Sequence, residues 1–285
     1  MFTERVQRVT DRSEVRLCSA IVSEEIALKL EGVTRRFDGF VAVSDISLAV
    51  PAGARHGIIG PNGAGKTTLF NLISGELKVT EGRIVLFGRD MTRLRPPRRV
   101  MLGLGRTYQI TRTFNPLTVR ENVALGVYGM RRSKFSMLRP WRSYREIDRS
   151  IEETADRFNL RDRLDTVASE LSHGEVRQLE IALAISLKPR LLLLDEPGAG
   201  LSPGERIEMG TLLRGLPASL TLVMIEHDMD LVRELVDTVS VLDYGRFVVE
   251  GPTHEIQRHP RVREIYLGKG GGGGGETPAG RDAGD

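Results

Sequence analysis

The sequence predicts an α/β fold built on a parallel sheet, and three observations lead to that prediction. A short apolar stretch, RHGIIG, runs directly into a glycine-rich turn. The turn is followed by KTTLFNLISG, which has helical spacing and a closing glycine. Two later apolar stretches, LLLLD and LTLVMIE, alternate with segments of helical character that follow Pro203 and Asp228. Strands that alternate with helices in this way are typical of a parallel sheet with crossover helices.

The composition fits a globular protein and excludes several classes. With 285 residues, of which 40% are apolar and 28% charged, the chain can bury a core. A formal net charge of +3 is too small to indicate nucleic acid as a partner. The single cysteine, Cys18, excludes an internal disulfide framework and a multi-cysteine zinc site, which suits the cytoplasm. No stretch approaches the roughly 20 apolar residues that span a bilayer, so any membrane role must come through a partner.

The ends of the chain differ in composition from its middle. Residues 1–24 lack a helical or strand period, and we expect them to form a flexible extension. Residues 269–285 include a run of six glycines at 270–275, a composition that cannot form a core, so we expect a disordered tail. The folded domain is therefore expected to occupy residues 25–268.

Two parts of this domain depart from the strand–helix alternation. From Ala27 to Val50 the pattern alternates around Asp38-Gly39, which predicts two strands of a small antiparallel β-subdomain. Residues 112–171 are rich in arginine and have helical period from about Tyr144 to Leu160. We expect this segment to form an inserted helical subdomain.

The segment GPNGAGKTT fits the pattern GxxxxGK[ST] of a phosphate-binding loop. Glycines let successive backbone amides face the phosphates, and the helix that follows directs its positive end toward them. Lys66 would contact the β- and γ-phosphates, and the Thr67 hydroxyl would coordinate Mg²⁺. The loop residues expected to bind ATP are Gly60, Pro61, Asn62, Gly63, Ala64, Gly65, Lys66, Thr67 and Thr68.

Three further polar residues follow apolar strands and are candidates for the chemistry. Asp195 ends LLLLD, where its carboxylate could hold Mg²⁺. Glu196 comes next and is expected to orient or deprotonate the attacking water. His227 follows the strand in LTLVMIE, and we expect it on the same rim of the sheet, within reach of the γ-phosphate.

In this order the motifs resemble the nucleotide-binding subunit of ABC transporters, over roughly residues 25–268. LSHGE, which begins at Leu171, is similar to the family's signature LSGGQ, and Gln109 in RTYQ is similar to its Q-loop glutamine. The resemblance implies a P-loop NTPase cassette with an antiparallel β-subdomain and an inserted α-helical subdomain. It also implies a dimer with a second cassette, in which Ser172 and Gly174 bind the γ-phosphate held by the partner.

The same resemblance implies roles for two more residues. Gln109 would contact Mg²⁺ and the nucleophile, and would link the catalytic core to the helical insertion. Phe37 stands where the family has an aromatic ring that stacks on adenine. Three residues depart from the family pattern: His173 replaces glycine, Glu175 replaces glutamine, and Ser202 replaces the aspartate of the D-loop. A neutral hydroxyl at Ser202 cannot make the charge-assisted bonds of an aspartate.

Within the family, RTYQITRTFNPLTVRENVALG and PRVREIYLG most resemble the cassettes of branched-chain amino acid importers. The resemblance implies an ATPase at the cytoplasmic face of the cell membrane, bound to permease subunits and served indirectly by a solute-binding protein. Urea import and lipopolysaccharide export remain alternatives, because similar cassettes serve them. A soluble ABC ATPase acting on DNA or ribosomes is a further alternative. One phosphate loop, one signature and one cysteine count against it.

Overall fold

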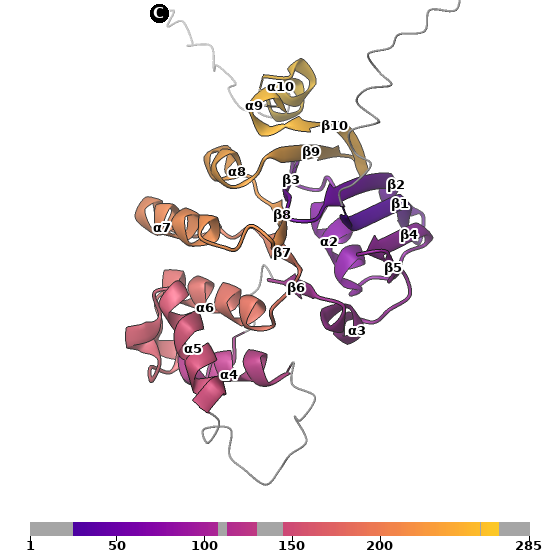
Figure 1. Cartoon of the computed structure of the whole chain (residues 1–285). Helices are drawn as coiled ribbons and strands as arrows, with labels where there is room; N and C mark the ends of the chain where they lie inside the picture. Colours follow the sequence, from indigo (N-terminus) through magenta and orange to yellow (C-terminus); the bar gives the residue numbers. More distant parts are fainter. Residues whose placement is uncertain (1–24, 108–112, 130–144, 257, 268–285) are drawn as a thin grey trace, which may run out of the picture.

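The computed structural model describes residues 25–107, 113–129, 145–256 and 258–267. They form three layers in Figure 1: a four-stranded sheet, a six-stranded sheet, and a group of helices on the far side of the larger sheet. The expectations for residues 1–24 and 269–285 concern segments outside these ranges. No helix among the described residues is long and apolar enough to cross a membrane.

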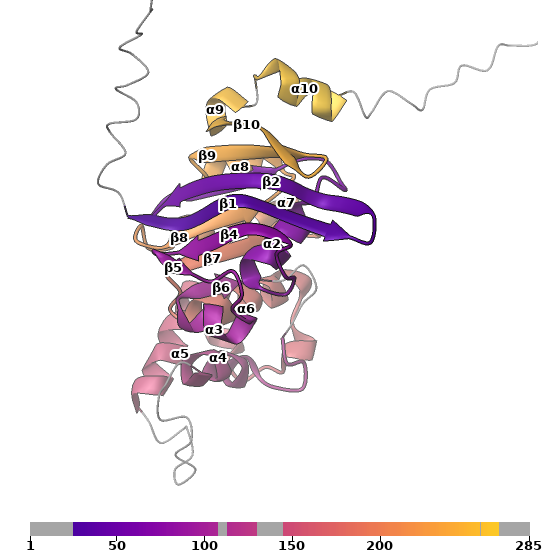
Figure 2. The ribbon, with the colours of Figure 1, turned by 90° about the vertical axis from the view of Figure 1, so that its right-hand side faces the viewer.

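The four-stranded sheet is antiparallel and follows the order β2-β1-β4-β5. Figure 2 views the molecule from this side, with β1 and β2 as the longest strands in front. The hairpin predicted around Asp38-Gly39 is confirmed, and Gly39 has the positive φ of 104° that such a turn requires. The strands of this four-stranded sheet are β1 (Ile26–Phe37), β2 (Phe40–Pro51), β4 (Glu81–Leu86) and β5 (Arg89–Asp90).

The six-stranded sheet follows the order β10-β9-β3-β8-β7-β6. Neighbouring strands are parallel except for the edge strand β10, which runs antiparallel to β9. The predicted parallel sheet with crossover helices is thus confirmed. Its strands are β3 (Arg55–Ile59), β6 (Leu104–Arg106), β7 (Leu191–Asp195), β8 (Thr221–Ile225), β9 (Thr238–Asp243) and β10 (Arg246–Pro252).

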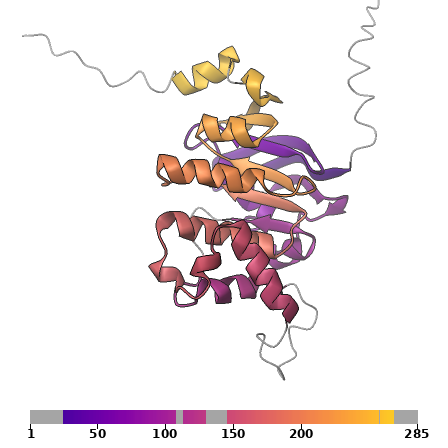
Figure 3. The same cartoon turned by 60° about the vertical axis from the view of Figure 1, so that its left-hand side comes forward.

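The helices occupy both faces of the larger sheet. Helix α2 lies between the two sheets (Figure 1), whereas α7 and α8 cover the opposite face in Figure 3. Helices α4, α5 and α6 gather at one end of the molecule. The helices are α2 (Lys66–Ser74), α3 (Pro96–Met101), α4 (Val119–Gly129), α5 (Arg145–Arg157), α6 (His173–Ser186), α7 (Pro203–Arg214), α8 (Met229–Leu235), α9 (Thr253–Ile256) and α10 (Pro260–Leu267).

Helix α5 accounts for the helical period predicted from Tyr144 to Leu160. It ends earlier than expected, at Arg157, and Asn159 then takes a left-handed φ of 55°. An asparagine tolerates this conformation better than most side chains, so the chain can reverse there. Apolar spacing alone does not reveal such a reversal, because Phe158 and Leu160 stay buried beyond the helix.

The core consists of two apolar clusters divided by the six-stranded sheet. Leu191 and Leu193 of β7 pack with α2 and the four-stranded sheet. Leu192 and Leu194 point the other way, into the cluster formed with the helices. Successive side chains of a strand point to opposite faces, so a strand covered on both sides is apolar throughout. This arrangement holds the carboxyl ends of β3, β7 and β8 rigidly beside one another.

Arg99 of α3 fastens the C-terminal end of α2 to the segment that follows it. The side chain is 1% exposed, and its guanidinium donates to the carbonyl oxygens of Leu72 and Ile73, both at 2.7 Å. It also donates to the carbonyl oxygens of Thr92 and Leu94. Burial lowers the pKa of Arg99 to about 10, so it remains charged at neutral pH. The last carbonyl groups of a helix lack hydrogen-bond donors within the helix, and Arg99 supplies such donors to Leu72 and Ile73.

We expect Arg99→Met to lower the free energy of unfolding by about 3 kcal/mol, because it keeps the apolar stem but leaves buried carbonyl oxygens unpaired. Chemical denaturation measures the change. Arg98→Met is the matched control, since Arg98 lies exposed on the same helix, and it should change stability by no more than about 0.5 kcal/mol. Equal effects of the two substitutions would contradict this assignment.

Candidate active site

The phosphate-loop segment 60–65 joins β3 to α2 and is packed between two other backbone segments. Gly245, in the turn between β9 and β10, donates its N–H to the carbonyl oxygen of Ala64, and Ser44 of β2 donates to that of Gly245. A Cβ atom at Gly65 would lie 2.6 Å from the carbonyl oxygen of Ala42, and Gly65 has a φ of 105°. Only glycine fits such an approach, so the packing explains the loop's composition.

A cavity of about 250 Å³ opens over the loop and the first turn of α2. Gly65 is the N-cap of α2 and offers no side chain to the helix, so the first N–H groups of the helix remain for a ligand. The cavity is lined by Phe40, Ala42, Asn62, Gly63, Ala64, Gly65, Lys66, Thr67, Thr68 and Glu196. The structure therefore brings Glu196 to the residues of the loop, as the sequence predicts.

Lys66 is buried beneath the loop. Its Nζ donates to the carbonyl oxygens of Gly60 at 2.6 Å and Pro61 at 3.0 Å. Burial lowers the pKa of Lys66, while the charges of Glu196 and Asp195 act in the opposite direction.

Asp195 and Glu196 leave the end of β7 in different directions. The side chain of Asp195 is 2% exposed, and burial raises its pKa against the opposing charge of Arg106. The Nη2 atom of Arg106 lies 3.4 Å from Asp195 Oδ2. Glu196 has a left-handed φ of 47°, and its N–H donates to the carbonyl oxygen of Ile225 at 2.9 Å. A non-glycine residue in this conformation is strained, and here it directs the carboxylate into the cavity.

Arg106 and Arg177 were not predicted, yet both support the two carboxylates. Arg106 also donates to Ser74 Oγ at 2.6 Å, which ties the end of β6 to the last turn of α2. Arg177 of α6 donates to the carbonyl oxygen of Glu196 at 2.8 Å and pairs with Glu180 at 2.6 Å. Sequence reasoning could have noticed that Arg106 begins the RTYQ segment, but no local pattern shows which carboxylate an arginine meets.

The end of β8 carries Glu226 and His227. The side chain of His227 is 62% exposed, whereas that of Glu226 is 1% exposed. Burial raises the pKa of Glu226 to about 7. Its carboxylate accepts from the backbone N–H of His227 at 3.1 Å and from that of Gly198 at 3.3 Å. The sequence did not single out Glu226 as a site residue, although it directly precedes the candidate His227.

The signature segment lies at the start of α6, away from the cavity over the loop. Ser172 is the N-cap of α6 and forms a capping box with Glu175: Ser172 Oγ accepts from the N–H of Glu175, and Glu175 Oε2 accepts from the N–H of Ser172. The backbone bond from Ser172 is the main reason why the pKa of Glu175 is lowered. Glu175, which stands where the family pattern has glutamine, therefore uses its carboxylate to cap a helix. Neither Ser172 nor Gly174 lines the cavity of its own chain.

Ser202 also caps a helix. Its Oγ accepts from the N–H of Glu205 in a second capping box, at the start of α7. Glu205 reaches across to α6, where a Cβ atom at Gly174 would lie 2.5 Å from its Oε1 atom. His173 approaches the loop before α7, since a Cβ at Gly200 would lie 2.8 Å from its Nε2 atom. Ser202, which stands where the family pattern has aspartate, thus stabilises the loop at the start of α7.

Phe37 does not line the cavity; its ring lies 4.4 Å from the guanidinium carbon of Arg35, and its partner across the hairpin is Phe40, which does line it. Gln109 lies outside the described residues. Thr107, shortly before it, is anchored to β7, where its N–H donates to the carbonyl oxygen of Leu193 at 2.9 Å.

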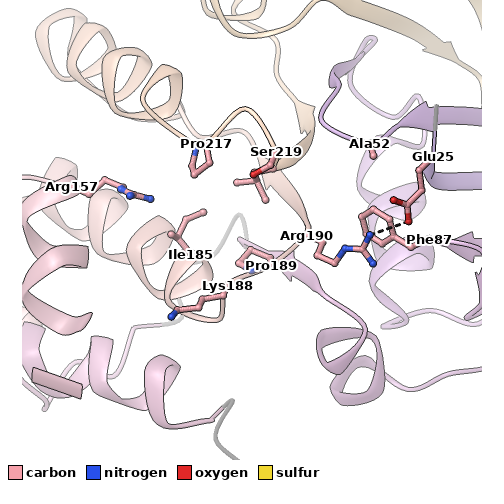
Figure 4. A pocket seen from close by; sticks show the side chains of 11 residues that line it. Glu25, Ala52, Phe87, Arg157, Ile185, Lys188, Pro189, Arg190, Pro217 and Ser219 are labelled. Atoms are coloured by element: carbon pink, nitrogen blue, oxygen red, sulfur yellow. Dashed lines mark hydrogen bonds and ion pairs between the residues drawn. The ribbon is translucent and has the colours of Figure 1, made fainter. Parts of the chain in front are cut away.

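A second cavity, of about 490 Å³, lies near the beginnings of β3, β7 and β8, away from the phosphate loop (Figure 4). Arg157 and Lys188 line it from the helical side. On the opposite side Arg190 stacks on the Phe87 ring at 3.6 Å and pairs with Glu25 at 3.0 Å. None of the residues expected at the active site lines this cavity.

Comparison with known proteins decides the family. The family model described as ABC transporter matches residues 43–199, which is more than half of the chain. The chain belongs to the ABC transporter family. A second model, described as branched-chain amino acid ATP-binding cassette transporter, matches residues 248–271. The protein is the ATP-binding and ATP-hydrolysing subunit of an ABC transporter, and cassettes of this family work with permease components.

Individual relatives agree with this assignment over almost their whole length. The cassette is 35% identical to the high-affinity branched-chain amino acid transport ATP-binding protein LivG of Salmonella typhimurium, over 85% of this chain and 98% of the relative. It is 34% identical to BraF of Pseudomonas aeruginosa, which has the same description and is covered to the same extent.

Solved structures confirm the fold class. The ADP conformation of MJ1267, an ATP-binding cassette of an ABC transporter, matches with a TM-score of 0.75 and 30% identity, over 85% of this chain and 99% of that one. The cassette cbiO1 from Clostridium perfringens matches with a TM-score of 0.71 and 27% identity, over 86% and 97% of the two chains. The predicted P-loop cassette fold is therefore correct.

We expect Ser202→Ala to lower the free energy of unfolding by about 1 kcal/mol, because it removes the side-chain cap of α7. Ser202→Thr retains the hydroxyl and should stay within about 0.5 kcal/mol of the parent. Urea denaturation of the three proteins tests the difference. A Ser202→Ala protein as stable as the parent would show that the cap contributes nothing.

Proposed function

We propose that this cassette hydrolyses ATP to power the import of branched-chain amino acids. The observation that carries the substrate class is the match of residues 248–271 to the branched-chain amino acid cassette model, at the end of a chain whose relatives LivG and BraF are matched over 98% of their lengths. The permeases and a solute-binding protein would select the amino acid, and the cassette would bind the permeases at the cytoplasmic face of the membrane.

The phosphate loop is the proposed site for the triphosphate of ATP. Its backbone N–H groups and the N-terminus of α2 would surround the phosphates, and Lys66 would exchange its bonds to loop carbonyl oxygens for bonds to phosphate. An aromatic ring at the end of the β1–β2 hairpin would stack on adenine. Phe37 is the ring predicted from the sequence, and Phe40 is the one that lines the cavity.

The residues at this site suit Mg²⁺. Thr67 offers a hydroxyl from the loop and Asp195 a carboxylate from the end of β7, both hard oxygen donors. Within the described ranges no group of three or more His, Cys, Asp or Glu could hold a metal by itself. Mg²⁺ characteristically takes one or two protein oxygens and completes its shell with water and phosphate oxygens. Bound there, it would neutralise charge on the phosphates; Gln109 stays a predicted further ligand.

Glu196 is the proposed group that orients and deprotonates the attacking water. Glu196 lines the cavity together with residues of the phosphate loop, and its backbone is held by Ile225 and Arg177. His227, exposed at the end of β8, would contact the γ-phosphate. Ser172 and Gly174 would complete the site of a second cassette, which suits their position outside the cavity of their own chain.

The permease would dock on an apolar groove between α4 and α6. This groove has a volume of about 390 Å³, and its walls include Leu183, Ala184 and Leu187 of the α6 side. Phe114 and Leu125 line it and are 54% and 46% exposed. Arg106 and Thr107, which contact β7 and Asp195, line its inner end. A partner seated in the groove would therefore touch residues that contact the catalytic strand.

We expect Glu196→Gln to reduce steady-state ATP hydrolysis by about 100-fold or more, because the amide cannot accept the proton of water. ATP affinity should stay within about threefold of the parent, since the phosphate loop is intact. Phosphate release and equilibrium nucleotide binding measure the two effects. Glu153→Gln, on the exposed surface of α5, is the control and should hydrolyse ATP normally. Normal hydrolysis by Glu196→Gln would refute the assignment.

Leu125→Arg tests the docking groove. It should reduce recovery of the cassette with co-expressed permeases by about tenfold or more, while basal ATP hydrolysis by the cassette alone stays within about twofold. Ile207→Arg is the matched control, because Ile207 is 68% exposed on α7 and does not line the groove. Undiminished recovery of Leu125→Arg would contradict docking at this surface.

Uptake of labelled leucine by vesicles that contain the cassette, its permeases and its binding protein tests the substrate class directly. ATP-dependent accumulation of leucine, with none of urea, supports the proposal. Accumulation of urea alone, or outward movement of lipopolysaccharide, would replace it. Recovery of the native cassette with ribosomes or DNA instead of membrane subunits would overturn transport itself.

A further inference from the structure

Glu226 is a buried carboxylate that touches both loops expected to carry catalytic groups. One loop follows β7 and runs from Glu196 through Gly198; the other follows β8 and carries His227. The Oε1 atom of Glu226 accepts from the N–H of Gly198 at 3.3 Å, and its Oε2 atom accepts from the N–H of His227 at 3.1 Å. The imidazole Nδ1 of His227 lies 3.6 Å from the same Oε2 atom.

The loop after β7 packs closely against this carboxylate. A Cβ atom at Gly198 would lie 2.6 Å from Glu226 Oε1 and 3.0 Å from a methyl carbon of Leu231 in α8. The backbone of the first loop must therefore come directly against the carboxylate. A further bond, from the N–H of Glu196 to the carbonyl oxygen of Ile225, joins the same two segments two residues earlier on the first and one residue earlier on the second.

We propose that Glu226 is a positioning residue for ATP hydrolysis, which joins the loop of Glu196 to His227 so that the two groups approach the γ-phosphate together. The inference rests on the roles proposed above for Glu196 and His227. Glu226 itself would not touch the nucleotide, because its side chain is only 1% exposed, whereas that of His227 is 62% exposed.

The bridge requires both carboxylate oxygens as acceptors. An ionised carboxylate accepts on either oxygen, whereas its protonated form turns one oxygen into a donor that faces an N–H group. Burial raises the pKa of Glu226 to about 7, with the charge of Glu196 acting in the same direction and the bonds from His227 and Gly198 acting against it. The bridge should therefore be complete above neutral pH and weaken as the pH falls through 7.

Other charged groups near this position are already paired. Arg206 of α7 lies on the far side of Gly198, whose Cβ would be 3.4 Å from the arginine Cγ, and its guanidinium pairs with Asp228 at 2.7 Å. From α8 the neighbour is the apolar Leu231. The loop groups Glu196 and His227 are thus the titratable neighbours that act on Glu226.

Glu226→Gln in the full-length chain tests the proposal, because glutamine keeps the shape but has one acceptor oxygen. We expect kcat for ATP hydrolysis above pH 7.5 to fall by about 5- to 30-fold, with KM and equilibrium ATP affinity within about twofold of the parent. The parent's kcat should also fall below pH 7 through a step near Glu226's pKa, and this step should be missing in the variant. A kcat within twofold of the parent across pH 6–8.5 would overturn the inference, as would an equal loss in kcat and in ATP affinity.

Two further variants separate this inference from the proposed function. Because Glu226 positions His227 together with the loop of Glu196, the loss of kcat in the double variant Glu226→Gln, His227→Ala should be smaller than the product of the two single losses, whereas fully multiplicative losses would show an independent role and contradict the inference. Glu196→Gln reports the proposed function by itself. Loss of turnover there, combined with normal turnover in Glu226→Gln, would overturn the positioning role and leave the proposed function standing. Glu234→Gln, on α8 and paired with Arg214 at 2.5 Å, is the matched control and should leave kcat unchanged.

Discussion

The close packing of three backbone segments holds the phosphate loop, and the rest of the site depends on it. The loop passes between β2 and the turn that joins β9 to β10, with bonds from Gly245 to Ala64 and from Ser44 to Gly245. The turn at Gly245 lies far from the loop in the sequence, so its bond to Ala64 depends on the tertiary fold. Helix α2 then carries the loop's far end into the core between the sheets, where Leu69 and Phe70 are fully buried. A site for a flexible triphosphate is thus built on a rigid support, which reduces the conformational cost of binding.

Buried arginines connect the layers around this support. Arg99 binds the last carbonyl groups of α2, Arg106 joins α2 to Asp195, and Arg177 joins α6 to the backbone of Glu196. A buried charge is costly unless it is paired, and a planar guanidinium can bind several acceptors at once. Each of these side chains therefore fixes one element relative to another. Together they connect α6 and the inner end of the proposed docking groove to the carboxylates at the end of β7.

Much of the fold and part of the site could be predicted from local patterns. The glycine-rich loop, the strand that ends in Asp195 and Glu196, and the hairpin at Asp38-Gly39 have signals within a few residues, and the structure has them where they were expected. Strands β4, β5, β6 and β9 were not singled out. Strands β4, β6 and β9 each pair with a strand from a distant part of the chain, and β5 and β6 have only two and three residues.

The contacts of individual side chains were harder to predict. Glu226 and Arg106 act through partners 28 and 89 positions away, which no periodicity reveals. The sequence marks Ser202 only as a departure from the aspartate of the family pattern, whereas in the structure it caps α7. The roles of Phe37 and Gln109 stay predictions from the family resemblance. The ring of Phe37 lies against Arg35, and Gln109 is outside the described residues.

The contact between Gly198 and Glu226 has a consequence for substitutions at position 198. A methyl group there would lie 2.6 Å from Glu226 Oε1 and 3.0 Å from a methyl carbon of Leu231. An alanine at this position would therefore have to push the carboxylate aside. Because the same carboxylate accepts from the N–H groups of Gly198 and His227, a change as small as one methyl group after β7 would be transmitted to the loop after β8.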